Sequence, residues 1–209
     1  MSKELIKRIL SSIILIPLAL YFIAHGSFIL MFFTFICFVV ACYEWHMMTK
    51  RTSYKIYGFI FLVISFYTFY ELSVEVVGFL FVFTICISTD IGGYVFGKIF
   101  NGPKLTKISP NKTYAGAIGG YFLSLISLTI IINYIDYPNT PIQYIIIFIL
   151  ISTVSQIGDI IVSYFKRKSK IKNTGKIIPG HGGLLDRIDG MIFAFPTYYL
   201  VNLTGYLNI

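Results

Sequence analysis

The sequence predicts an all-α protein, a polytopic bundle of about seven membrane-spanning helices. Hydrophobic residues make up 56% of the 209 residues and charged residues only 12%, which is about half the charged fraction of an ordinary soluble domain. The apolar residues also fall into runs close to the ~20 residues that cross a bilayer as a helix. The three cysteines include no CxxC pair, which excludes a disulfide scaffold and indicates no zinc or redox site.

The apolar runs define seven expected spans in order along the chain. The first, 9–25, follows a basic stretch, and we expect it to remain as an uncleaved helix because no small-x-small cleavage site is evident. The second covers 28–47. The remaining expected spans are 57–70, 74–88, 114–133, 143–163 and 190–208. The two short runs 57–70 and 74–88 are separated only by Glu71 and Glu75, so one long tilted helix is the alternative.

The positions of Lys and Arg decide between these alternatives, because cytoplasmic loops collect cations. With two separate short spans and the N-terminus inside, all 17 Lys and Arg fall in inside segments. The outside loops then contain His25, Glu71, Glu75 and Asp136, and no Lys or Arg. We therefore predict a single integral domain, residues 1–209, in the cell (inner) membrane. Its N-terminus is inside, its C-terminus is outside, and its basic loops face the cytoplasm.

Polar residues collect in two of the inside segments, and the first follows the fourth expected span. Asp90 lies at the end of an apolar run, where a carboxylate is costly without a function or a partner. Lys112 and Thr113 supply a cation and a hydroxyl that suit a phosphate, although the spacing is not that of a Walker A loop. The glycines at 93–97 and 116–120 either admit an anion or pack two helices closely.

The second polar stretch continues the sixth expected span. If that helix extends to Arg167, the side chains at i, i+4, i+7 and i+8 share one face, namely Asp159, Ser163, Lys166 and Arg167. Beyond a turn at 179–183, Asp186 and Asp189 are expected on the first turn of the last span. The helix dipole explains one acid at a helix N-terminus. Three carboxylates beside several cations suit Mg²⁺ shared with substrate phosphates.

His181 lies in the expected turn and has no Cys or His companion nearby for a zinc site. We expect it to donate a hydrogen bond to a phosphate or to brace the turn. Nucleic-acid binding is not expected, because the cations flank membrane spans and no groove-binding module is present.

The order of these residues resembles the signature of the bacterial phosphatidate cytidylyltransferases, also called CDP-diglyceride synthetases. The matching residues are Ser163-x-x-Lys166-Arg167-x4-Lys172-Asn173 and Pro179-Gly-His-Gly-Gly183-x-x-Asp186-Arg187-x-Asp189. A second block is similar in Asp90-x-Gly92-Gly93-Tyr94-x-x-Gly97-Lys98 and Ser109-Pro-Asn-Lys112-Thr113-x-x-Gly116-x-x-Gly119-Gly120. The resemblance covers about 86–195, where we expect the catalytic blocks. The chain departs from the usual pattern at Asn173, Val162 and Ala115, each of which replaces a carboxylate or an amide.

The resemblance implies transfer of a cytidylyl group from CTP to phosphatidic acid in the bilayer, with CDP-diacylglycerol and pyrophosphate as products of this step of phospholipid biosynthesis. Catalytic roles are implied for Asp159, Asp186, Asp189, Lys166 and Arg167. Substrate contacts are implied for Ser163, Lys172, His181, Arg187, Asp90, Lys112 and Thr113. The expected cofactor is Mg²⁺, with Asp159, Asp186 and Asp189 as its ligands.

Three other functions remain open from the residues alone. A CTP-dependent kinase acting on a polyprenol-type alcohol would release CDP and would need a base. An ion-coupled transporter would place its acidic residues near the midplane of the bilayer, whereas here the acids cluster beside cations near one face. A non-catalytic scaffold for anionic lipid would tolerate loss of a single Asp. The sequence also leaves a homodimer open.

Overall fold

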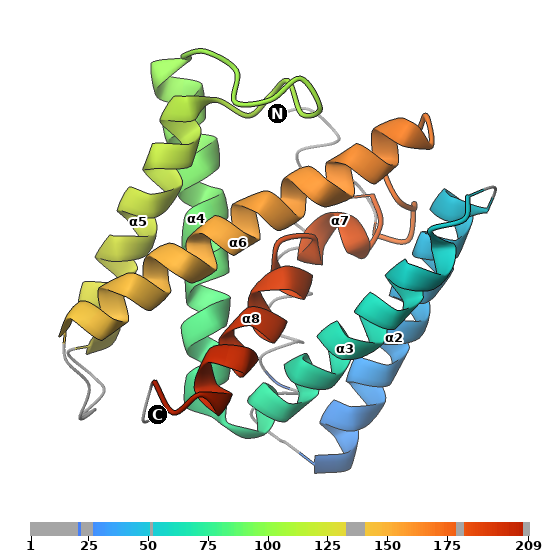
Figure 1. Cartoon of the computed structure of the whole chain (residues 1–209), viewed down its shortest axis with the longest axis horizontal. Helices are drawn as coiled ribbons and strands as arrows, with labels where there is room; N and C mark the ends of the chain where they lie inside the picture. Colours follow the sequence, from blue (N-terminus) through green and yellow to red (C-terminus); the bar gives the residue numbers. More distant parts are fainter. Residues whose placement is uncertain (1–20, 22–26, 51, 133–140, 179–181, 207–209) are drawn as a thin grey trace. The chain divides into compact units, whose positions relative to one another are not determined.

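The computed structural model describes residues 21, 27–50, 52–132, 141–178 and 182–206 (Figure 1). Every regular element within these ranges is a helix, so the all-α prediction is confirmed. The elements are α2 (Ser27–Thr49), α3 (Lys55–Val74), α4 (Val76–Phe100), α5 (Tyr114–Ile132), α6 (Pro141–Lys168), α7 (Leu185–Ile188) and α8 (Met191–Leu203). The chain divides into two compact units. The first comprises Met1–Val76 and Phe165–Asp189, and the second comprises Val77–Tyr164 and Gly190–Ile209.

Four of the described helices are long and apolar enough to cross a membrane, and the chain is accordingly a membrane protein. They cover Phe28–Thr49, Lys55–Val74, Val76–Phe100 and Ile142–Lys168. Tyr114–Thr129 and Met191–Leu203 are shorter apolar helices. The first expected span, 9–25, falls almost wholly outside the described residues. The number of spans and their orientation stay predictions.

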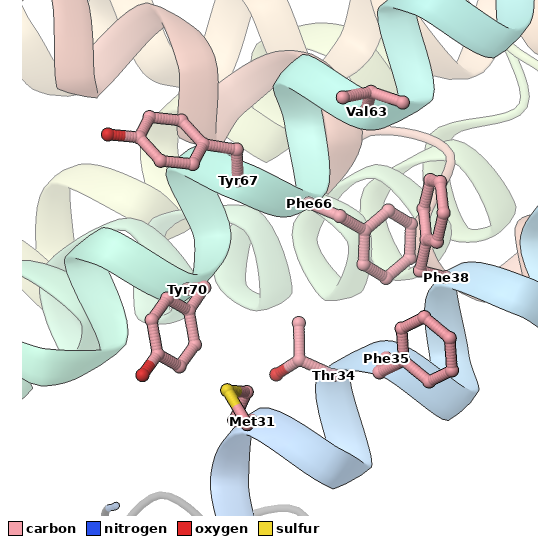
Figure 2. Close-up of a pocket in the computed structure, with 8 residues that line it drawn as sticks. All are labelled: Met31, Thr34, Phe35, Phe38, Val63, Phe66, Tyr67 and Tyr70. Atoms are coloured by element: carbon pink, nitrogen blue, oxygen red, sulfur yellow. The ribbon is translucent and has the colours of Figure 1, made fainter.

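In the first unit, α2 and α3 lie side by side (Figure 1). Phe38 and Phe66 pack edge to face with their ring centroids 5.6 Å apart, and Trp45 Nε1 donates a hydrogen bond to the carbonyl of Lys55 at 3.0 Å. A groove of about 220 Å³ remains between the two helices (Figure 2). It is lined by Met31, Thr34, Phe35, Phe38, Val63, Phe66, Tyr67 and Tyr70. The two helices contain the apolar runs 28–47 and 57–70, which the sequence predicted as separate spans.

The short runs around Glu71 and Glu75 form two helices, as the charge distribution predicted. α3 ends at Val74, and α4 begins at Val76. Glu75 between them has ψ of 83°, which is outside the helical range. The alternative of one long tilted helix is therefore wrong.

In the second unit, α4 and α5 approach closely through glycines (Figure 1). A Cβ atom on Gly116 would lie 2.7 Å from the carbonyl oxygen of Gly93, and one on Gly92 would overlap the carbonyl of Gly119. The packing interpretation of these glycines, rather than anion binding, therefore agrees with the structure. Polar contacts join α4 to α6 as well, since Thr89 Oγ1 donates to Ser152 Oγ at 2.8 Å.

Two expected boundaries are wrong. The fourth span was expected to end at 88, but α4 continues to Phe100, so Asp90 lies within a helix. Gly92, Gly93 and Gly97 are therefore also part of α4, where they lie against α5. Asp186 was expected on the first turn of the last span, but the separate helix α7 carries it, and α8 begins at Met191.

Candidate functional site

The helix that carries the second polar stretch extends as the sequence predicted. α6 is continuous from Pro141 to Lys168, so the helical spacing assumed for Asp159, Ser163 and Lys166 is confirmed. Ser163 is 6% exposed and Lys166 8%. Arg167 is exposed and donates to the carbonyl of Ile171 at 3.3 Å. At the end of α6, Lys166 is therefore buried and Arg167 is exposed to solvent.

Asp186 lies at the centre of a hydrogen-bonded cluster in the first unit. Lys166 Nζ donates to Asp186 Oδ1 at 2.9 Å. The backbone N–H groups of Thr174 and Gly183 donate to Asp186 Oδ2 at 2.8 and 3.0 Å. Asp189 Oδ2 lies 3.9 Å from Lys166 Nζ. We call Lys166, Thr174, Gly183, Asp186 and Asp189 the Asp186 cluster. It brings together three residues that the sequence predicted for the site.

The backbone near Gly182 sets up this cluster. Ile178 and Gly182 exchange backbone hydrogen bonds of 2.9 and 3.1 Å. Gly182 has φ of +93°, and a Cβ atom on it would lie 2.8 Å from Asp186 Oδ2. Only glycine adopts this conformation readily. It follows that Gly182 lets the next N–H group, that of Gly183, reach the Asp186 carboxylate.

A second cluster, in the second unit, is built around Lys112. The Nζ of Lys112 forms an ion pair with Asp159 Oδ2 and donates to the carbonyl of Gln156 at 3.5 Å. Thr113 Oγ1 accepts a hydrogen bond from Gly116 N at 3.0 Å, which caps the start of α5. We call Lys112, Thr113, Gln156 and Asp159 the Lys112 cluster. The pairing of Lys112 with Asp159 joins the two blocks of polar residues that the sequence identified.

The remaining predicted residues have other environments. The side chains of Asp90, Lys172 and Arg187 are exposed. His181 lies outside the described residues. In the described part of the chain, no three His, Cys, Asp or Glu side chains form a group that could hold a metal ion.

Both clusters pair a carboxylate with a lysine. The Lys166–Asp186 pair is the more buried, with side-chain exposures of 10% and 6%, compared with 24% and 29% for Lys112 and Asp159. A buried ion pair persists only where further hydrogen bonds satisfy its remaining lone pairs, and the two amides on Asp186 Oδ2 do so. An ammonium group held in this way can exchange its carboxylate partner for a phosphate oxygen, because both present anionic oxygens that accept charge-assisted hydrogen bonds.

Sequence reasoning missed two residues of this region, Glu44 and Thr174. Glu44 is 1% exposed, and its Oε2 accepts a hydrogen bond from Thr174 Oγ1 at 2.8 Å. The signal for Glu44 was present, because it is a carboxylate inside the expected span 28–47. Thr174 gives no comparable signal, since nothing in its neighbourhood predicts which carboxylates it contacts.

Comparison with known proteins finds a family model and curated relatives that match this chain. The family model described as the cytidylyltransferase family matches residues 56–204. A phosphatidate cytidylyltransferase of Staphylococcus aureus is 41% identical over 135 residues, which are 64% of this chain and 52% of that protein. Those of Staphylococcus saprophyticus and Brucella suis are 42% and 40% identical over 118 and 124 residues. They are matched over 45% and 44% of their length, so the chain spans about half the length of these relatives.

Proposed function

The chain belongs to the cytidylyltransferase family, and we propose on this basis that it transfers a cytidylyl group from CTP to phosphatidic acid. The products are CDP-diacylglycerol and pyrophosphate. The observation that carries the proposal is the family match over residues 56–204, which includes every residue of the Asp186 and Lys112 clusters. The relatives named phosphatidate cytidylyltransferase supply the substrate class.

The proposed reaction is a displacement at the α-phosphorus of CTP. An oxygen of the phosphatidate phosphate forms the new bond to this phosphorus, and the bond to the bridging oxygen of pyrophosphate breaks. A phosphate monoester has its second pKa near 6, so it is already an anionic nucleophile at neutral pH. No general base is needed, and the main barrier is repulsion between two polyanions.

The lysines of the two clusters are suited to reduce that repulsion. Lys166 is held by Asp186 at 2.9 Å, and Lys112 is held by Asp159. We assign both ammonium groups to substrate phosphate oxygens during turnover, when they exchange a carboxylate for a phosphate. Exposed side chains add further positive charge to the stretch of chain that carries Lys166 and Asp186, namely Arg167, Lys172 and Arg187. Arginine can bind phosphate with two parallel hydrogen bonds.

A Mg²⁺ ion remains part of the proposal, with Asp186 and Asp189 of the first unit as the carboxylates that would hold it together with substrate phosphates. Asp159, the third ligand expected from the sequence, belongs to the second unit, where it pairs with Lys112. The donors fit in kind, because Mg²⁺ prefers carboxylate oxygens together with substrate phosphates. Among the described residues, Asp186 Oδ1 accepts one hydrogen bond, from Lys166, which leaves a lone pair of this oxygen for a cation. When bound, the ion would neutralise charge on the α-phosphate and on the leaving pyrophosphate.

The membrane character of the chain fits a lipid substrate. Phosphatidic acid need not leave the bilayer if its headgroup enters between helices while CTP arrives from the cytosol. We propose that the catalytic loops face the cytoplasm, since all 17 Lys and Arg fall on one side under the predicted topology. Anionic lipids would be attracted to the same face.

The test is an assay with purified protein in detergent, phosphatidic acid, Mg²⁺ and CTP labelled at either the α- or the γ-phosphate. The proposal predicts that α-label enters lipid while pyrophosphate is released in equal amount. In a parallel reaction with a polyprenol alcohol in place of phosphatidic acid, transfer of γ-label to the alcohol would select the lipid kinase instead. If α-label stays in water-soluble products, the transferase function is refuted.

A further inference from the structure

Glu44 is a buried carboxylate to which the reaction described above assigns no role. It lies on α2 and is 1% exposed. Removing a carboxylate from water is costly unless hydrogen bonds replace its hydration. Its place in the core of the first unit therefore requires compensating donors.

Those donors come from the segment that carries Asp186. Leu184 N donates to Glu44 Oε1 at 2.9 Å, and Leu185 N donates to Oε2 at 2.9 Å. Thr174 Oγ1 donates to the same Oε2 at 2.8 Å. All three donors are neutral groups, and two of them are backbone amides at the start of α7. Glu44 therefore fixes the backbone immediately before Asp186.

Thr174 connects the two carboxylates. Its hydroxyl donates to Glu44, and its backbone N–H donates to Asp186 Oδ2 at 2.8 Å. Gly183 is packed into the same space, since a Cβ atom on it would overlap both Thr174 Oγ1 and Glu44 Oε2. The absence of a side chain at Gly183 lets Glu44 reach the loop. Thr174 is thus held by both Glu44 and Asp186, Gly183 by Asp186, and Leu184 and Leu185 by Glu44.

We propose that Glu44 is a positioning residue, whose carboxylate fixes Thr174 and the start of α7 so that Asp186 keeps its orientation toward Lys166. The inference rests on the proposed function, because it assigns Glu44 a part in the same reaction. Glutamine has nearly the same shape but cannot accept from all three donors. Its NH₂ group must face the N–H of either Leu184 or Leu185, and neither amide can rotate away as the Thr174 hydroxyl can.

The test compares four variants of the full chain in detergent: Glu44→Gln, Thr174→Val, Thr174→Ser and, as a matched control, Glu71→Gln at an exposed carboxylate of α3. Cytidylyl transfer gives kcat and KM for CTP, and hydrogen exchange measured by mass spectrometry reports the amides of Leu184 and Leu185. For Glu44→Gln we expect kcat to fall by about tenfold or more. The KM for CTP should change by less than about twofold, because Glu44 does not touch substrate.

The two amides should exchange faster in Glu44→Gln, while Glu71→Gln should match the unmodified protein in every readout. Thr174→Ser keeps the hydroxyl and should retain more of the rate than Thr174→Val. The proposal is overturned if Glu44→Gln and Thr174→Val both turn over at the unmodified rate, or if Glu44→Gln leaves the exchange of both amides unchanged.

If Glu44→Gln does not fold, the two Thr174 variants decide. A higher rate of cytidylyl transfer in Thr174→Ser than in Thr174→Val supports the proposal, and equal rates in these two variants overturn it. Absence of cytidylyl transfer by the unmodified protein would refute the proposed function instead. In that case the exchange of Leu184 and Leu185 would still show whether Glu44 holds the loop.

Discussion

Replacing Asp186 with Asn removes a negative charge from the Asp186 cluster with almost no change in volume. The asparagine oxygen can take the place of Oδ2 and keep the hydrogen bonds from Thr174 N and Gly183 N, which are 2.8 and 3.0 Å long. Its NH₂ group must then face the ammonium of Lys166, which donates to Oδ1 at 2.9 Å in the unmodified protein. The substitution therefore removes one charge-assisted hydrogen bond and leaves the loop otherwise held.

The magnitude follows from that loss. A hydrogen bond to a charged group contributes about 1.5–3 kcal/mol to stability, and the Asp186 side chain is only 6% exposed, so solvent screens the pair little. We expect the free energy of unfolding to fall by about 2 kcal/mol, with the protein still folded. Turnover should fall by more than about 100-fold, because residues that support a metal ligand already cost 10- to 100-fold when they are changed.

Two measurements check this prediction. Thermal unfolding in detergent gives the stability, and transfer of α-label from CTP to lipid gives the rate, with Glu71→Gln as the control for loss of an exposed carboxylate. A double-mutant cycle with Lys166→Met should show coupling of about 0.5–3 kcal/mol, as expected for residues in direct contact. Near-normal rates in Asp186→Asn, in protein shown to be folded, would refute the role assigned to this carboxylate.

Three further predictions concern other parts of the chain. Asn173→Asp restores the residue usual in the family and, because this side chain is exposed, should be tolerated in a steady-state rate assay; complete loss of activity would contradict this. Gly92→Ala should lower stability by about 1–3 kcal/mol in thermal unfolding, because its Cβ would overlap a carbonyl of α5. The matched control is Gly102→Ala, which should leave the stability unchanged because its Cβ would lie 3.7 Å from the nearest atom. In a variant without the native cysteines, Lys176→Cys should react with a membrane-impermeant maleimide only after cells are permeabilised, and Glu71→Cys should react in intact cells. The reverse pattern would overturn the predicted topology.

The parts of the fold that sequence could predict are those set by hydrophobicity and charge. The break between α3 and α4 followed from Glu71, Glu75 and the distribution of cations. The end of α4 did not, because Asp90 and the glycines after it have the composition of a loop. Their helical conformation depends on α5, whose backbone fits against Gly92 and Gly93. The spacing of the glycines at 93–97 and 116–120 indicated helix packing, but it did not indicate where α4 ends.

The candidate site shows the same division. Lys166 and Asp186 could be selected because charges are rare in this chain, and the structure pairs them across a separation of 20 residues. The partners on the other side of the loop could not be selected in the same way. Thr174 acts through both its hydroxyl and its backbone amide, and Glu44 contacts it from 130 residues away. Hydrogen bonds to backbone amides depend on the fold and are not encoded by residue type.

The central claim is that a phosphatidate oxygen attacks the α-phosphorus of CTP. The most direct measurement uses vesicles that contain the protein and phosphatidic acid with ¹⁸O in its phosphate, supplied with CTP and Mg²⁺ and followed by mass spectrometry of both products. The account predicts a lipid that has gained a cytidylyl group and kept all of its ¹⁸O, with none in the pyrophosphate. Appearance of ¹⁸O in pyrophosphate, or the absence of any cytidine-containing lipid, would contradict it.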